Sequence, residues 1–390
     1  MYNARFSVID MRLVLAIIFL LLSPPLLAQQ AAPSIPPVPP IAARAYLLFD
    51  FNSAQLLASH NPQERVEPAS LTKLMTAYLT FGALKQKTIQ LEQTVPVSER
   101  AWRAEGSRMF IEPRKPVTVN ELIRGMIVQS GNDACIALAE AVAGSEEIFA
   151  QMMNREAQRL GMKNTSFVNS TGLSHPQHYS TAYDLALLAA SIIRDFPEYY
   201  PLYSTKEFRY NNIFQSNRNR LLWTDPTVDG MKTGYTENAG YCLITSARRG
   251  ERRLISVVLG AASEAMRATE SQKLLNYGFQ FYDSVRLYEK NQPVATLQVW
   301  KGNGNTIKAG FANDLYLSLP KGQADKLKAS VESLQPLLAP ISTGQRIGAL
   351  KITLDGKPFR ELPVVALESV PLAGILGRGW DSIRLLFKNL

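Results

Sequence analysis

The sequence Pro-Ala-Ser-Leu-Thr-Lys-Leu-Met at residues 68–75 contains a possible nucleophile and its base. Ser70 and Lys73 stand three positions apart, so a helix that begins at Ser70 would carry both side chains on one face, one turn apart. A serine hydroxyl needs a base beside it at neutral pH, and a lysine amine can serve if burial or a nearby charge lowers its pKa. By itself this short pattern equally fits an exposed helix start with a solvated lysine.

Apolar residues behind Ser70 recur at helical spacing and predict a helix with one face in a core. They are Leu71, Leu74, Met75, Tyr78 and Leu79. Ser70 is therefore expected at a helix N-terminus, where free N–H groups and the helix dipole favour negative charge.

The segments around this helix predict an α+β fold, in which helices pack around one antiparallel sheet. A strand at 46–51 and a return strand at 56–58 precede it, and a helical region follows, with helices at 121–128, 133–143, 148–160 and 182–194. Strands are then predicted at 231–234, 241–245 and 254–260, with a long helix at 263–281.

Two further tripeptides support the nucleophile–base pair. Ser130-Gly131-Asn132 falls in a predicted loop between helices, and Lys232-Thr233-Gly234 opens a predicted strand. Either could arise by chance, as a helix-capping Ser130 or a solvated Lys232. Both in this order after Ser-x-x-Lys resemble the motif set of β-lactamases and penicillin-binding proteins, which has a Ser-x-Asn element in second place.

The catalytic roles follow from the chemistry of the side chains. Ser70 would attack a carbonyl carbon and form an acyl-enzyme, with Lys73 taking its proton. Ser130 could relay a proton to the leaving nitrogen, because a hydroxyl both donates and accepts. The backbone N–H groups of Ser70 and Tyr235 would form the oxyanion hole.

The remaining motif residues are predicted to bind substrate. Lys232 would keep the local potential positive, which helps to hold Lys73 deprotonated and attracts a carboxylate. Asn132 offers an amide, and Thr233 and Thr236 offer hydroxyls to a carboxylate. Gly234 would let a substrate backbone lie against the strand edge.

Composition narrows the class of partner and cofactor. The chain has 390 residues, 46% of them hydrophobic, and a net charge of +9 without a long Lys/Arg block. Nucleic acid is therefore not implied, whereas a phospholipid headgroup layer or an acidic polymer suits the diffuse charge. No Cys or His cluster has metal spacing, so we expect no metal and no cofactor.

The few cysteines and histidines are expected to be structural. Cys135 and Cys242 allow one disulfide or two buried thiols, and the apolar surroundings of Cys135 favour thiols. His60, His175 and His178 are expected to be solvated loop residues, since none has the context of a Ser-His-Asp triad.

The chain is predicted to contain five segments. Residues 1–28 resemble a secretion signal, with an uncleaved anchor as the alternative, and residues 29–41 are a Pro-rich linker. Residues 42–283 would form the catalytic domain and 284–371 a small all-β domain with a hairpin turn at Asp355-Gly356.

The last segment, 372–390, predicts an amphipathic helix that lies in a membrane surface, with a helix packed on the β domain as the alternative. Its apolar face comprises Leu372, Ile375, Leu376, Trp380, Ile383, Leu386, Phe387 and Leu390. The opposite face carries Arg378, Asp381, Arg384 and Lys388.

Together these features resemble the serine D-alanyl-D-alanine carboxypeptidases, the low-molecular-mass penicillin-binding proteins. The resemblance implies a β-lactamase/transpeptidase-like catalytic domain that removes the terminal D-Ala from peptidoglycan stem pentapeptides, is acylated by β-lactams and regulates wall cross-linking at the periplasmic face of the inner membrane. It also implies that an arginine binds the terminal carboxylate. Arg267 is the expected match, with Arg248 and Arg249 as alternatives.

Two positions depart from that family. Tyr235 stands where a histidine is frequent, and Ser174 where an aspartate is frequent. Both are on the substrate side, so they bear on deacylation and peptide preference rather than on the nucleophile.

Three other functions share part of this pattern. A class A β-lactamase would carry a Glu-x-x-Leu-Asn segment between the second and third motifs, which is absent, and would not need residues 286–390. A DD-endopeptidase uses the same chemistry on cross-linked peptides. A non-catalytic β-lactam sensor or wall-binding module is disfavoured because the catalytic motifs are intact.

Overall fold

A computed structural model describes residues 35–388 of the chain. The predicted signal segment at 1–28 and residues 29–34 of the predicted linker lie outside the described residues. Residues 35–41 carry neither helix nor strand, as expected for the end of a linker.

The first half of the fold is built on a five-stranded antiparallel sheet with the order β2-β1-β9-β8-β7. Its strands are β1 (Ala45–Asp50), β2 (Gln55–His60), β7 (Val228–Thr236), β8 (Gly240–Arg249) and β9 (Arg252–Ala261). The predicted sheet is confirmed, including the return strand and the three late strands.

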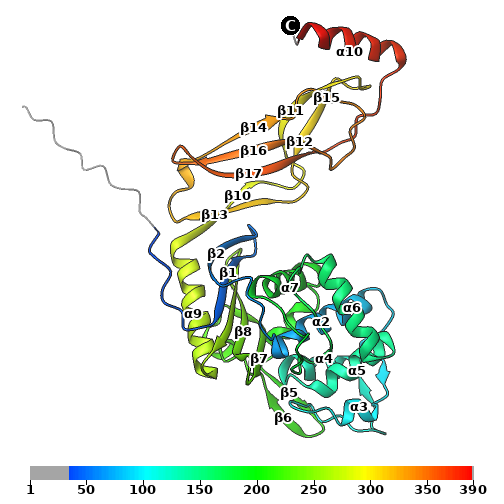
Figure 1. Cartoon of the computed structure of the whole chain (residues 1–390), viewed down its shortest axis with the longest axis vertical. Coiled ribbons are helices and arrows are strands. Elements are labelled where there is room, and N and C mark those ends of the chain that lie inside the picture. Colours follow the sequence, from blue (N-terminus) through cyan, green and yellow to red (C-terminus); the bar gives the residue numbers. More distant parts are fainter. Residues whose placement is uncertain (1–34, 389–390) are drawn as a thin grey trace, which may run out of the picture. The chain divides into compact units, whose positions relative to one another are not determined.

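Helices cover both faces of this sheet, with α9 on one face and a group of helices on the other (Figure 1). The main helices are α2 (Lys73–Lys85), α4 (Val119–Val128), α5 (Asn132–Ala143), α6 (Glu146–Arg159), α7 (Ala182–Asp195) and α9 (Glu264–Phe281). Side-chain caps from Thr118, Ser145, Thr181 and Ser263 begin α4, α6, α7 and α9, which explains where the sequence starts these helices.

Smaller elements connect the main ones. They are the 3-10 turns η1 (Ala69–Thr72) and η2 (Tyr200–Ser204), the short helices α3 (Glu99–Trp102) and α8 (Leu221–Thr224), and the paired strands β3 (Thr94–Val95) with β4 (Val117–Thr118) and β5 (Glu207–Tyr210) with β6 (Ile213–Ser216).

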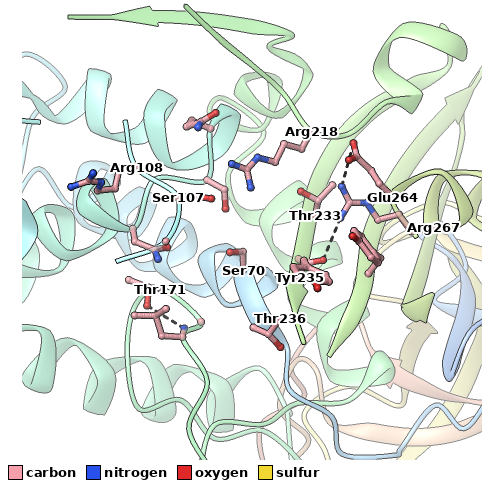
Figure 2. A pocket seen from close by; sticks show the side chains of 18 of the residues that line it. Ser70, Ser107, Arg108, Thr171, Arg218, Thr233, Tyr235, Thr236, Glu264 and Arg267 are labelled. Carbon is pink, nitrogen blue, oxygen red and sulfur yellow. Dashed lines mark hydrogen bonds and ion pairs between the residues drawn. The ribbon is translucent and has the colours of Figure 1, made fainter. Parts of the chain in front are cut away.

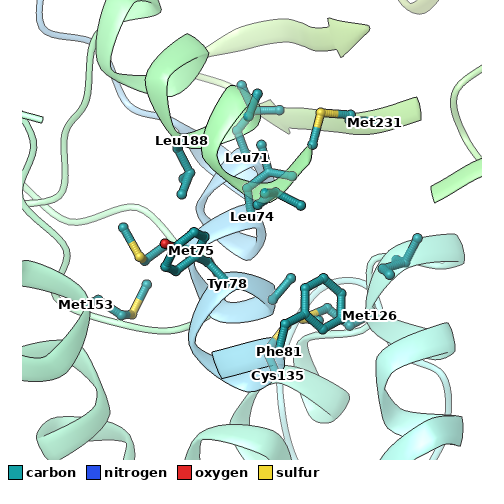
Figure 3. Packing of buried hydrophobic residues seen from close by; sticks show 14 of the residues in the cluster. Leu71, Leu74, Met75, Tyr78, Phe81, Met126, Cys135, Met153, Leu188 and Met231 are labelled. Carbon is teal, nitrogen blue, oxygen red and sulfur yellow. The ribbon is translucent and has the colours of Figure 1, made fainter. Parts of the chain in front are cut away.

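Helix α2 differs from its prediction, because it is buried on nearly all sides rather than along one face. Thr76, Ala77 and Thr80 lie away from the predicted apolar stripe and are also fully buried. Figure 3 shows α2 passing through the centre of the core, with Met126, Met153 and Leu188 from other helices around it. A helix that is surrounded in this way positions its first turn rigidly.

Residues from 282 onward form a separate β-rich region with its own apolar core. Strands β10 (Tyr282–Tyr288) and β13 (Leu315–Pro320) pair with each other, and a six-stranded sheet has the order β14-β16-β17-β12-β11-β15. The latter strands are β11 (Pro293–Trp300), β12 (Thr306–Gly310), β14 (Leu327–Ser333), β15 (Leu337–Leu338), β16 (Arg346–Leu354) and β17 (Lys357–Ala366), with the short turn η3 (Ala324–Lys326). The predicted turn at Asp355-Gly356 joins β16 and β17, and both residues have positive φ, as a two-residue hairpin requires.

The C-terminal helix α10 spans Ile375–Lys388 and begins three residues later than predicted. Leu372 precedes the helix and forms a β-bridge with Gly302, so it does not belong to the apolar face. Within residues 35–388, no helix has both the length and the apolar character needed to cross a membrane. Cys135 and Cys242 are buried free thiols, which agrees with the favoured expectation.

Candidate active site

All three sequence motifs meet at one cavity of about 650 Å³ in the first region. Its walls come from η1, the segment 106–110, the loop 129–132, the loop 171–173, strand β7 and the start of α9. Figure 2 shows Ser70 in the middle of this cavity, with Arg108 on one side and Arg267 on the other.

The predicted nucleophile Ser70 and its predicted base Lys73 lie side by side, although the α-helix begins at Lys73 rather than at Ser70. Ser70 lies in η1 and Lys73 is the first residue of α2, and the Lys73 Nζ lies 2.9 Å from the Ser70 Oγ. Ala69, just before the serine, has a φ of 47°, a left-handed conformation that is costly for a non-glycine residue. Backbone strain of this kind is typical of functional sites.

The Lys73 amine has two other partners, and both can only accept a hydrogen bond. They are the Asn132 Oδ1 at 2.7 Å and the Thr171 carbonyl oxygen at 2.6 Å. The Asn132 amide orientation is fixed because its Nδ2 donates to the Glu105 carbonyl. A neutral amine has two N–H groups and one lone pair, so these acceptors would use both N–H groups and leave the lone pair for the Ser70 hydroxyl.

Lys73 is fully enclosed, and burial lowers its pKa to about 8. The positive charge of Arg218 acts in the same direction more weakly. Burial is therefore the main cause of the lowered pKa of Lys73. The sequence had suggested that the positive charge of Lys232 would lower it. With this pKa, about one tenth of the Lys73 amine is neutral at pH 7.

Ser130, which the sequence predicts to relay a proton, is hydrogen-bonded to Lys232. The Lys232 Nζ donates to the Ser130 Oγ at 2.9 Å and to the Thr233 carbonyl oxygen at 3.0 Å. Burial, and then the charge of Lys73, lowers the pKa of Lys232 well below its usual value. Ser130 has a φ of 67° and does not cap α5, whose first residue follows Gly131, so the alternative role as a helix cap is not seen.

Asp133 fixes the segment that forms one cavity wall, a role the sequence analysis missed. Its buried carboxylate accepts hydrogen bonds from the backbone N–H groups of Met109, Phe110 and Ile111. A carboxylate that accepts several backbone N–H groups is well compensated for its burial.

The loop 169–174 presents the Thr171 carbonyl to Lys73, and buried groups hold it in place. The Glu146 carboxylate accepts from both the N–H and the hydroxyl of Ser170, and Thr76 donates to the Ser170 carbonyl. Gly172 has a φ of 86°, and a Cβ there would lie 1.8 Å from the Ala69 carbonyl oxygen. The loop therefore packs directly on the turn that carries Ser70.

His178 is buried, so the expectation that it is solvated is wrong. Its Nδ1 accepts from the Val168 N–H at 3.2 Å, and its Nε2 lies 2.7 Å from the Thr72 Oγ1, in the turn between Ser70 and Lys73. The Val168 N–H requires an unprotonated Nδ1, so the Nε2 carries the proton and donates to Thr72. Burial lowers the pKa of His178 to about 4, which keeps this arrangement neutral at ordinary pH.

Strand β7 lines the cavity with Thr233, Gly234, Tyr235 and Thr236. A Cβ on Gly234 would lie 3.1 Å from the Pro68 carbonyl oxygen and 3.3 Å from the Ala69 Cβ, so glycine here allows β7 to approach the serine turn. This is a different reason from the predicted approach of a substrate backbone. The Tyr235 ring is half exposed and lies 4.4 Å from the Tyr241 ring, centroid to centroid.

Glu67 binds two residues on the substrate side of the cavity, Thr236 and Ser174. The hydroxyls of Thr236 and Ser174 both donate to the Glu67 Oε2, at 3.0 and 2.8 Å. Thr236 must leave Glu67 before it can bind a carboxylate. An aspartate at position 174 would place a second carboxylate against Glu67, which explains why serine fits here.

Of the three arginines considered for binding the terminal carboxylate, Arg267 is the one that lines the cavity. It lies in the first turn of α9, donates from Nη1 to the Gly234 carbonyl and faces Glu264, with 3.8 Å between Nη2 and Oε1 (Figure 2). Among the described residues, neither Arg248 nor Arg249 lines the cavity, and they pair instead with Glu251 and Asp225.

The cavity also contains Arg108, Arg218 and Glu264, which the sequence analysis did not identify. No motif marks these residues, because isolated arginines and glutamates occur throughout an ordinary surface. In the described part of the chain, no three His, Cys, Asp or Glu side chains come together to hold a metal ion.

The fold and site together define a serine acyl-transfer enzyme in which a lysine, not a histidine, lies beside the nucleophile. The model of the family described as D-alanyl-D-alanine carboxypeptidase matches residues 30–263, and the model described as Penicillin-binding protein 5, C-terminal domain, matches residues 282–372. The chain belongs to the D-alanyl-D-alanine carboxypeptidase family.

Individual relatives match over most of their length. D-alanyl-D-alanine carboxypeptidase DacC of Escherichia coli is 44% identical over 357 residues, which cover 90% of this chain and 89% of that protein. The DacA carboxypeptidase of Haemophilus influenzae is 43% identical over 359 residues, which cover 90% of this chain and 91% of that protein. The resemblance that the sequence predicted is confirmed.

Solved structures agree with the fold assignment. Penicillin binding protein 5 from Haemophilus influenzae has a TM-score of 0.82 at 41% identity, covering 87% of this chain and 99% of that chain. Penicillin-binding protein D2 from Listeria monocytogenes, in an ampicillin-bound form, has a TM-score of 0.57 at 31% identity, covering 62% of this chain and 98% of that one.

Proposed function

We propose that this protein removes the terminal D-Ala from peptidoglycan stem pentapeptides through an acyl-enzyme on Ser70. The observation that carries the proposal is the environment of the Lys73 amine, whose two obligate acceptors direct a neutral lone pair to the Ser70 hydroxyl. Membership of the family supports the reaction, and the site geometry supports the roles of individual residues.

In the first step, neutral Lys73 takes the Ser70 proton while the Ser70 Oγ attacks the carbonyl carbon of the penultimate D-Ala. The negative charge that develops on the carbonyl oxygen is stabilised by the N–H groups of Ser70 and Tyr235. Both residues line the cavity.

In the second step, the bond to the terminal D-Ala breaks and its nitrogen needs a proton. Ser130 donates this proton and is resupplied from the protonated Lys73, so the relay is neutral overall. Because the Ser130 Oγ accepts the hydrogen bond from Lys232, the Ser130 O–H can donate to the leaving nitrogen. Water then hydrolyses the ester and regenerates Ser70.

The terminal carboxylate is placed on the Arg267 side of the cavity. Arg267, Thr233 and Lys232 supply cationic and hydroxyl groups there, with Thr236 joining once it leaves Glu67. A bound carboxylate would also favour the charged form of Lys232. Asn132 and the Gly234 segment of β7 would hold the peptide backbone.

A β-lactam would acylate Ser70 in the same way, because its ring carbonyl takes the place of the peptide carbonyl. An ampicillin-bound form among the structural neighbours supports this. Regulation of wall cross-linking would follow from removal of the D-Ala that cross-linking needs.

We place the protein at the periplasmic face of the inner membrane, held by α10 after secretion through residues 1–28. Helix α10 exposes Ile375, Leu376, Trp380 and Leu386 by 62% or more. On the other face, the Asp381 carboxylate accepts from the Lys301 N–H at 2.6 Å, so the apolar face points away from the β-rich region. An exposed apolar stripe with cations opposite suits the surface of a bilayer.

The reaction is tested by mass spectrometry of D-Ala released from a synthetic stem pentapeptide. We expect release by the wild type and a loss of about 10³-fold or more in Ser70→Ala, since the variant lacks the nucleophile. Acylation of the wild type by penicillin without release of D-Ala would contradict the proposal and favour a sensor. Faster cleavage of cross-linked dimers than of pentapeptide would instead favour a DD-endopeptidase, and rapid penicillin turnover a β-lactamase.

The anchor is tested by membrane fractionation of the full chain and of a variant that ends at residue 371. We expect the full chain to sediment with membranes and the truncated chain to stay in the supernatant. Sedimentation of both would contradict a role for α10.

A further inference from the structure

One side of the cavity carries a cation that the proposed reaction does not use. Arg108 lies in the segment 106–110, and Figure 2 shows it on the opposite side of Ser70 from Arg267. Its guanidinium carbon lies 5.2 Å from the centre of the Phe110 ring, which is 40% exposed. An arginine held over an aromatic face has fewer conformations to lose when it binds a planar anion.

The backbone around Arg108 is rigid, so its position is part of the fold. The Asn132 N–H donates to the Ser107 carbonyl at 2.6 Å, and the Asp133 carboxylate binds the N–H of Met109 and of Phe110. The Met109 side chain is buried and packs against Gly125, where a Cβ would overlap its sulfur. Because Met109 is anchored in the core, the side chains of its neighbours Arg108 and Phe110 line the cavity.

Arg108 differs from the other arginines of the cavity in its charge surroundings. Arg267 faces Glu264, and the charge of Glu264 also acts on Arg218. Within residues 35–388, by contrast, no carboxylate forms an ion pair with the Arg108 guanidinium, which lies over the Phe110 ring. The guanidinium is therefore available to pair with an anion that the ligand supplies.

We propose that Arg108, supported by Phe110, is a specificity-determining residue that binds a carboxylate on the acyl part of the substrate. The inference rests on the proposed function, which sends the terminal D-Ala toward Arg267 and the rest of the peptide toward Arg108. The penultimate residue is an alanine and has no charge to offer. The nearest side chain that can carry a carboxylate is that of the residue before it, and we assign the carboxylate to that side chain, so the preferred stem peptides are those with an anionic side chain at that position.

The test uses three peptides with one backbone, Nα-acetyl-Lys-D-Ala-D-Ala, in which the lysine Nε is succinylated, acetylated or free. They present an anion, a neutral group and a cation on the same side chain. We measure kcat and KM for release of D-Ala at low salt. The wild type should prefer the succinylated peptide over the acetylated one by about fivefold in kcat/KM, carried by KM, with the free amine last. Added salt should reduce this preference.

Variants then assign the preference to a residue. Arg108→Gln should bring the ratio between the succinylated and acetylated peptides to about one, and Arg108→Glu should reverse the order of the anionic and cationic peptides. Arg108→Lys should keep part of the preference, because it keeps the charge. The matched control is Arg103→Gln, since Arg103 also lies over an aromatic ring, that of Trp102, but outside the cavity. It should leave the ratio unchanged.

Several results would overturn the inference. They are a wild type without preference for the succinylated peptide, an unchanged ratio in Arg108→Gln, or loss of the preference in Arg218→Gln but not in Arg108→Gln. A wild type that releases D-Ala from none of the three peptides would instead contradict the proposed function, so the two failures are distinguishable.

Discussion

The catalytic region and the β-rich region after it bury very different kinds of residue. In the first, two lysines, an aspartate and several hydroxyls are buried around Ser70, and Ala69 and Ser130 have positive φ. In the second, the core is formed by aliphatic side chains such as Ile307, Leu317, Ile347, Leu350 and Val364. Buried charge reduces stability, and its concentration in the first region indicates that chemistry, not packing, selected it there.

The domain boundaries remain a proposal, with the catalytic domain at 42–283 and the β-rich domain at 284–371. The change in core composition supports a boundary near the end of α9 at Phe281. If this division holds, substitutions in the two cores should have similar effects on stability and different effects on catalysis.

The largest effect is expected where the buried charge is removed. Lys73→Met keeps the length of the side chain but leaves Ser70 without a base, so the rate of acylation by penicillin should fall by about 10³-fold. Labelling with a fluorescent penicillin measures this rate. Lys85→Met at the other end of α2 is the matched control and should acylate at the wild-type rate. Equal rates in the two variants would contradict the view that the buried charge of the catalytic region serves the chemistry.

The next largest effect is expected from a matched pair of substitutions, one in each core. Leu74→Ala in α2 and Leu350→Ala in β16 each remove a fully buried side chain and should each lower the free energy of unfolding of their own region by about 3 kcal/mol. Leu74 follows Lys73 directly, so only Leu74→Ala should also slow acylation of the folded protein. Urea unfolding and penicillin labelling make the comparison, and slower acylation in Leu350→Ala would show that the β-rich core also supports the site.

A smaller effect should come from the buried His178. Its pKa is lowered from 6.5 to about 4 in the folded protein, so the unfolded chain binds the extra proton first as the pH falls. Stability is therefore fully present above pH 6.5 and is lost as the pH approaches 4, by about 2 kcal/mol between pH 7 and pH 5.

His178→Gln should flatten that part of the pH dependence, because an amide can still bond to Thr72 but takes up no proton. Urea unfolding at pH 7 and pH 5 tests this in both proteins. The exposed His175 provides the control, and His175→Gln should leave the wild-type slope in place. An unchanged slope in His178→Gln would show that another group causes the loss.

Much of the fold and the motif part of the site could be predicted from the sequence. Local patterns were sufficient for the helices at 121–128 and 182–194 and for the three late strands, because hydrophobic period and turn residues act over short distances. The three motifs can be recognised from their residue types and their order, and the structure brings them to one cavity. The burial of α2 on nearly all sides was missed because its threonines read as a polar face.

The missed parts of the site depend on contacts between distant segments. His178 was expected to be solvated because it lies in a turn-rich loop, and only its contact with Thr72 shows that it is buried. Asp133 binds a segment more than twenty residues earlier, which no local pattern predicts. Arg108 and Arg218 reach the cavity through loop geometry, and an arginine in a loop is ordinarily a surface residue.

The central claim is that burial keeps Lys73 neutral often enough to act as the base for Ser70. The most direct measurement is the second-order rate of acylation of Ser70 by penicillin between pH 6 and pH 10. Because the pKa of Lys73 is lowered to about 8, the neutral fraction rises as the pH increases through that value. The rate should climb nearly tenfold from pH 6 to pH 7 and level off above about pH 8.5. A rate that is flat from pH 6 to pH 9, or that falls as the pH rises, would contradict the claim.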